Sequence, residues 1–170
     1  MLAYVLVVFA VLLRLVPHVP DVTPLTGLAL FGGVYLQRKQ AIWLPLVALF
    51  VSDLFLPSEP IITRLSVYGS FCLIGLIGLV LRSRKNFRNV IIASLFSSTL
   101  FYVITNFAFL YPTAMYGHNW SGIMQSYTNA LPFFRNAIIG DISYTSLLFG
   151  AYELMLRYVH LSHTVEKTDN

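Results

Sequence analysis

Six apolar stretches, separated by short segments of charged or turn-forming residues, constrain this chain more than any other feature of its sequence. Those stretches are Leu2–Val16, Pro24–Leu36, Ala41–Leu56, Leu65–Leu81, Val90–Leu110 and Pro132–Tyr158. A helix needs about 20 apolar residues to cross the hydrocarbon core of a bilayer, and the last two stretches meet that length. The second stretch has only about 13 residues, so the sequence leaves open whether it spans fully.

The composition agrees with a bundle that is solvated by lipid. Of the 170 residues, 57% are hydrophobic and 11% are charged, whereas a soluble domain usually carries about 25% charged residues. A fold of this size cannot hide so much apolar surface from water. We therefore expect an all-α, polytopic membrane helical bundle of about six transmembrane helices. Residues 1–160 would form one transmembrane domain, and residues 161–170 a disordered cytoplasmic tail.

The positions of the basic residues predict the topology. If all six stretches cross the membrane and the N-terminus is inside, the cytoplasmic segments hold eight of the 11 basic residues: Arg38, Lys39, Arg82, Arg84, Lys85, Arg88, Arg157 and Lys167. The outer segments hold only Arg64. The positive-inside rule thus favours a multi-pass protein of the bacterial inner membrane with both termini in the cytoplasm. Basic residues placed in this way indicate topology and no nucleic-acid partner. Before the last stretch, Trp120–Tyr127 is expected to form a short interfacial helix.

Several ionisable residues lie inside the apolar stretches, where a charge costs roughly 2.5 to 3.5 kcal/mol near the centre of a helix. Under the predicted topology, four of them converge on the outer half of the bundle, and amide groups lie at a similar depth. With one histidine and one tyrosine near the outer end added, the candidate ligand-binding residues are Arg14, His18, Asp53, Tyr68, Asn106, Arg135, Asn136 and Asp141. Glu153 is assigned a structural ion pair with Arg157, one helical turn further on.

Two interpretations of this polar set stay open. In the first, Arg14–Asp53 and Arg135–Asp141 are buried pairs that hold the helices in register, since buried ionic groups are weak evidence of function. In the second, the set surrounds a water-accessible cavity that faces the outside. A bundle built only for stability would use small apolar contacts between its helices, which favours the cavity.

A stripe of small residues runs along the fourth stretch: Gly69, Cys72, Gly75 and Gly78. Small residues at this spacing are typical of close helix packing. Alternatively, the stripe makes room for a bulky ligand, and Cys72 is a soft ligand atom for a metal. A single cysteine in an apolar helix is more often inert packing. One cysteine also excludes an internal disulfide.

Motifs of known enzymes are absent. The sequence has no HExxH, no GxSxG and no phosphate-binding P-loop, and its histidines are scattered. We therefore expect no enzymatic activity and no intrinsic cofactor, and any ATP-driven step would need a partner protein.

Three groups of motifs carry a resemblance: Arg14-Leu-Val-Pro-His-Val-Pro-Asp-Val-Thr-Pro with Ala29-Leu-Phe-Gly-Gly; Pro45 to Ser52-Asp53-Leu-Phe; and Thr105-Asn106-Phe with Ala130-Leu-Pro-Phe-Phe-Arg-Asn136 and Gly140-Asp141. Over Arg14 to Gly150, the chain resembles a family of small bacterial membrane proteins whose activity is not established. That family is similar in plan to the substrate-binding S-components of energy-coupling-factor vitamin transporters and to BtuM-type cobalamin transporters. The second likeness implies cobalamin as the transported ligand, with its cobalt contacted by Cys72.

Three functions follow from these observations. The first is an uptake protein that binds a small water-soluble nutrient, such as cobalamin, from the outer side, either alone or with an energising module of the energy-coupling-factor type. The second is an intramembrane enzyme that acts on lipid or isoprenoid head groups. The third is a non-catalytic scaffold subunit.

Overall fold

The computed structural model describes residues 2–16, 21–56 and 59–168, and it is all-helical in these ranges. The expected all-α fold is therefore confirmed. The elements are α1 (Leu2–Leu15), α2 (Leu25–Tyr35), α3 (Arg38–Asp53), α4 (Ile61–Leu81), α5 (Phe87–Thr105) and α6 (Trp120–Thr168), with the 3₁₀ turns η1 (Arg82–Arg84) and η2 (Ala108–Leu110). Among the described helices, two are long and apolar enough to cross a membrane: Ile61–Arg84, which joins α4 to η1, and α5. Six crossings remain a prediction.

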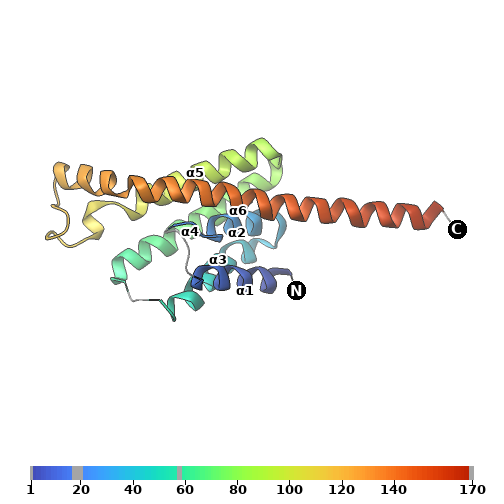
Figure 1. Ribbon diagram of the computed structural model, residues 1–170, viewed down its shortest axis with the longest axis horizontal. Coiled ribbons are helices and arrows are strands. Elements are labelled where there is room, and N and C mark those ends of the chain that lie inside the picture. The colour runs from blue at the N-terminus through green and yellow to red at the C-terminus, as the bar shows by residue number, and fades with distance from the viewer. Residues whose placement is uncertain (1, 17–20, 57–58, 169–170) are drawn as a thin grey trace.

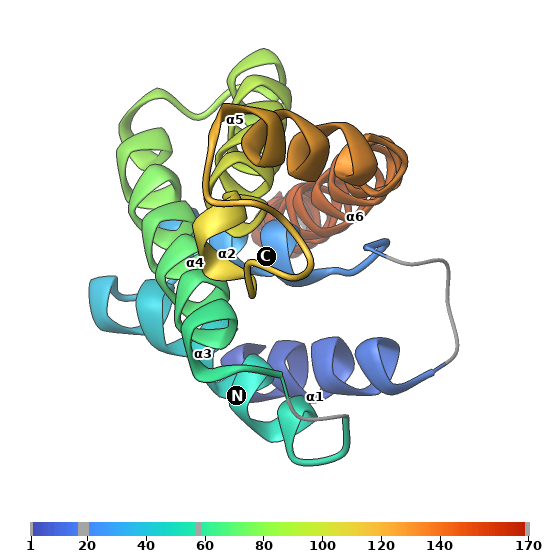
Figure 2. The same ribbon diagram turned by 90° about the vertical axis from the view of Figure 1, so that its left-hand side faces the viewer.

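Helix α2 is enclosed by the other helices (Figure 2). Every residue from Leu25 to Val34 is buried, and α3, α4 and α6 all pack against it. At 1.5 Å per residue, its 11 residues give a length of about 16 Å, which is roughly half of the hydrocarbon thickness. The short second stretch is thus the central helix of the bundle, and its side chains are covered by protein.

Glycines allow α2, α3 and α4 to approach one another closely. A Cβ atom on Gly33 would lie 2.5 Å from the backbone of Gly78. A Cβ on Gly78 would lie 2.7 Å from the Leu30 carbonyl oxygen, and one on Gly75 would lie 2.8 Å from that of Ala41. Such distances are far below ordinary contact, so only glycine fits. At Gly75 and Gly78, the small-residue stripe therefore serves helix packing, as its first interpretation predicted.

Helix α6 differs from the prediction at both of its ends. It is one helix of 49 residues that runs through Pro132, so Trp120–Tyr127 is its first part and not a separate interfacial helix. Contacts on both sides of the proline hold it together, because the Tyr102 ring packs on both Tyr127 and Phe134. Toward its other end, α6 extends well past the bundle (Figure 1). The structure continues α6 through residues 161–168, where no glycine or proline ends the helix, and the disorder of the tail stays a prediction.

Consecutive helices run in alternating directions, so that the connecting segments gather at two ends of the bundle (Figure 1). At one end, which we call the basic end, the Arg82 guanidinium donates hydrogen bonds to the carbonyl oxygens of Gly33 and Leu36. At the same end, Lys85 Nζ lies 2.6 Å from Glu153 Oε1. The predicted partner of Glu153 was therefore wrong: the segment between α4 and α5 brings Lys85 across to α6, and Lys85 forms the ion pair instead of Arg157.

Candidate functional site

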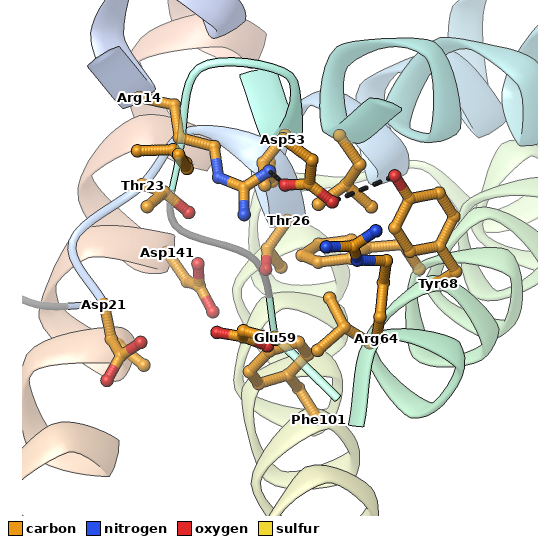
Figure 3. A pocket seen from close by; sticks show the side chains of 16 residues that line it. Arg14, Asp21, Thr23, Thr26, Asp53, Glu59, Arg64, Tyr68, Phe101 and Asp141 are labelled. Carbon is orange, nitrogen blue, oxygen red and sulfur yellow. Dashed lines mark hydrogen bonds and ion pairs between the residues drawn. The ribbon is translucent and has the colours of Figure 1, made fainter. Parts of the chain in front are cut away.

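A cavity of about 450 Å³ lies at the opposite end of the bundle, which we call the cavity end (Figure 3). All six helices and two connecting segments contribute to its wall. The lining residues are Arg14 of α1; Asp21 and Thr23 before α2; Leu25 and Thr26 of α2; Leu49 and Asp53 of α3; Leu56 and Glu59 between α3 and α4; Arg64, Val67, Tyr68 and Phe71 of α4; Phe101 of α5; and Ala137 and Asp141 of α6. Residues distant in sequence thus share one polar site.

One side of the cavity is a network around Asp53. Its Oδ1 lies 2.9 Å from Arg14 Nη1, and its Oδ2 accepts a hydrogen bond of 3.0 Å from the Tyr68 hydroxyl. The Arg14 guanidinium also donates to Ser52 Oγ at 2.7 Å. Figure 3 shows Arg14, Asp53 and Tyr68 in line along the wall. The ion pair therefore links α1 to α3 and also lines the cavity. Both interpretations of the sequence, a pair that holds helices together and a polar cavity, apply to Arg14 and Asp53.

The opposite side of the cavity holds Asp141, which is only 4% exposed. Its Oδ2 lies 2.6 Å from Ser98 Oγ of α5, and the Thr26 side chain of α2 also interacts with it. The predicted pair with Arg135 does not form, and Arg135 is exposed and does not line the cavity. The reason is helix geometry: residues three or four apart share a face of a helix, and these two are six apart.

The mouth of the cavity carries charges that the candidate set did not include. Asp21, Glu59 and Arg64 all line it (Figure 3). Asp21 has a φ of 63°, a left-handed conformation that aspartate tolerates better than most residues. Burial raises the pKa of the nearby Tyr111 phenol above its ordinary value, and the charges of Glu59 and Asp21 add to that shift. The sequence signal for Arg64 was its position as the one basic residue of the outer segments.

The remaining candidates lie elsewhere or outside the described residues. Asn106 caps the end of α5, where its side chain donates to the Tyr102 carbonyl oxygen at 3.0 Å. Asn136 is half-buried but does not line the cavity, and neither does Cys72 of α4. In the part of the chain that the structure describes, no group of three His, Cys, Asp or Glu side chains is arranged to hold a metal ion. His18 lies outside the described residues.

A buried polar seam runs from Asp141 into the bundle, and sequence reasoning missed all of it except Asp141. Its members come from α2, α5 and α6, and none is more than 4% exposed: Thr26, Ser94, Ser97, Ser98, Asp141 and Thr145. Ser94 Oγ and Thr145 Oγ1 are 3.4 Å apart. The sequence feature that could have revealed these residues is the spacing of the three serines, which places them on one face of a helix.

A second cavity, of about 350 Å³, lies at the basic end. Its lining includes Tyr35, Lys85, Ser146, Glu153 and Arg157. The two cavities are thus at opposite ends of the α5–α6 contact.

The chain belongs to DUF6580, a family of unknown function, whose sequence profile matches residues 1–164. Comparison with curated proteins and with solved structures gave no match. The likeness to vitamin-transporter S-components and to BtuM-type transporters therefore stays a prediction.

Proposed function

We propose that this protein is a multi-pass membrane protein that takes up a small water-soluble nutrient through the cavity at its cavity end. One observation carries the proposal: charged and polar side chains from five helices and two connecting segments meet around one cavity, while large apolar side chains cover much of the exterior. A polar site inside an apolar exterior is the arrangement expected of a protein that handles a water-soluble ligand within lipid.

The exterior supports the membrane location. Phe50, Phe96 and Leu147 are each more than half exposed, and soluble monomers rarely expose large contiguous apolar areas. The charges support the orientation, because Arg82, Lys85 and their neighbours gather at the end opposite the cavity. By the positive-inside rule, that end faces the cytoplasm and the cavity faces outward. The short helices α1 and α3 would then lie where the bilayer around the protein is thinned, whereas α2 is covered by protein.

The cavity lining suggests a class of ligand. Its volume of about 450 Å³ is typical of sites for small organic molecules. The wall carries four carboxyl groups and two guanidinium groups. Arg14 and Asp53 pair with each other, and over the whole lining the carboxyl groups outnumber the guanidinium groups. We therefore favour a ligand with an amine or other cationic group, and with an acceptor group that Arg64 binds. Because Cys72 is not part of the lining, cobalamin is a less favoured ligand than a smaller nutrient.

Thermal unfolding of the purified protein in detergent tests this proposal. A panel of vitamins, amino acids and small amines, with cobalamin included, should contain a compound that raises the melting temperature. At 100 times its dissociation constant, a ligand stabilises the folded state by about 2.7 kcal/mol.

Two arginine variants make the test specific. Arg64→Ala should abolish the ligand-induced stabilisation, because its guanidinium lines the cavity. Arg135→Ala removes the same kind of side chain from the exposed face of α6 and should leave the stabilisation unchanged. A flat response across the panel, with no small molecule bound to the protein as purified, would contradict uptake. Turnover of lipid by the purified protein would favour the enzyme instead.

A further inference from the structure

Asp141 has an environment that does not suit a carboxylate ion. It lies in the middle of α6, only 4% exposed, and it forms no ion pair within the described residues. The two hydroxyl side chains beside it, Ser98 and Thr26, are buried as well. A charged carboxylate in a buried site without a cation costs several kilocalories per mole, so such a group normally binds a cation or a proton.

Hydrogen bonding around Ser98 accommodates both the protonated and the ionised form of Asp141. Ser98 Oγ lies 2.6 Å from Asp141 Oδ2 and 3.0 Å from the carbonyl oxygen of Ser94. Both of those groups are acceptors when Asp141 is ionised, but a serine hydroxyl has only one hydrogen to donate. When Asp141 carries a proton, it can donate to Ser98 Oγ while the Ser98 hydroxyl donates to the carbonyl oxygen of Ser94. When the proton leaves, the Ser98 hydroxyl turns to the carboxylate, and no backbone movement is needed.

We propose that Asp141 is an exchangeable proton-binding site in the wall of the uptake cavity. The O–H bond of the carboxyl group breaks, water in the cavity accepts the proton, and the carboxylate that is left accepts hydrogen bonds from Ser98 and Thr26. The reverse step restores the acid. This inference rests on the proposed uptake function. It adds that the proton on Asp141 is the ion whose movement is coupled to uptake.

The other charged groups around the cavity leave Asp141 without a permanent counter-charge. Arg14 on α1 is held by Asp53 on α3, and Asp21 before α2 acts on Asp141 as a like charge. Glu59 and Arg64, from the start of α4 and the segment before it, line the same cavity without an ion pair to Asp141 in the described part of the chain. From α5, the lining receives the uncharged Phe101.

The polar seam continues from Asp141 toward the basic end. Thr145 lies one turn further along α6, where it meets Ser94 at 3.4 Å. The next residue, Ser146, lines the second cavity. The seam therefore ends at Thr145, next in sequence to a residue that lines the inner cavity.

Infrared spectroscopy of the full chain in lipid nanodiscs tests the proposal with D₂O as the probe. At neutral pH, the wild type should show the C=O stretching band of a protonated carboxyl group. Asp141→Asn should lose this band, whereas Asp53→Asn, which removes the carboxylate paired with Arg14, should keep it. On transfer to D₂O the band should shift, because the proton exchanges with water in the cavity. If Asp141→Asn does not fold, Asp141→Glu should instead move the band, and Ser98→Ala should shift it by removing its hydrogen-bond partner.

Three results would overturn the proposal. A band that is the same in wild type and Asp141→Asn would mean that Asp141 is ionised at neutral pH. A band that does not shift in D₂O would mean a sealed, non-exchanging proton. Absence of the band from the wild type, together with stabilisation by NaCl but not by KCl, would make the site one for sodium. The thermal panel reads ligand binding independently, so failure of the proton site and failure of the uptake function are distinguishable.

Discussion

The closest helix contact in the bundle gives the sharpest test of the fold, because the stripe on α4 contains both a crowded and an open glycine. In Gly78→Ala, the new Cβ would lie 2.7 Å from the Leu30 carbonyl oxygen and 3.0 Å from the Cα of Gly33. These are backbone atoms, so α2 and α4 must move apart. Overpacking of this kind typically costs about 1–3 kcal/mol.

Gly69→Ala is the matched control. Nothing lies within 4 Å of the Cβ that it adds, so the substitution gains helix propensity of about 0.5–1 kcal/mol without a clash. Gly78→Ala gains the same propensity, so the two variants should differ in stability by the overpacking cost alone, about 1–3 kcal/mol. At about 2–4 °C per kcal/mol for a chain of this size, the melting temperature of Gly78→Ala should be lower by roughly 2–12 °C. Equal melting temperatures in the same detergent would refute the close α2–α4 contact.

Two further predictions concern individual side chains at the cavity end. Asp53→Asn leaves the Arg14 charge without its partner and should destabilise the protein by about 1–3 kcal/mol. In a double-mutant cycle with Arg14→Gln, the two losses should be less than additive, and strict additivity would show that the pair contributes nothing. Cys72→Ser should leave ligand-induced stabilisation unchanged, because Cys72 does not line the cavity. If Cys72→Ser lost stabilisation by cobalamin but by no other compound, the result would instead support the contact between Cys72 and cobalt that the sequence suggested.

The sequence by itself determined where the helices lie. The stretch Leu65–Leu81 corresponds to α4, which ends at the same residue, and Val90–Leu110 largely overlaps α5. These features are local, because apolar length and flanking charges act within each segment. The pair of Arg14 with Asp53 was also foreseeable, since both lie near the ends of stretches that the topology brings to one side.

Apart from that pair, only the tertiary structure decided which polar side chains meet. It gave Asp141 the hydroxyl of Ser98 in place of Arg135, and it gave Glu153 the amine of Lys85 in place of Arg157. Apolar periodicity places a helix, but nearly uniform hydrophobicity does not reveal how the helix is rotated. That rotation is set by close packing, as at the glycines of α2 and α4, and it determines which polar groups face the cavity and which face outward.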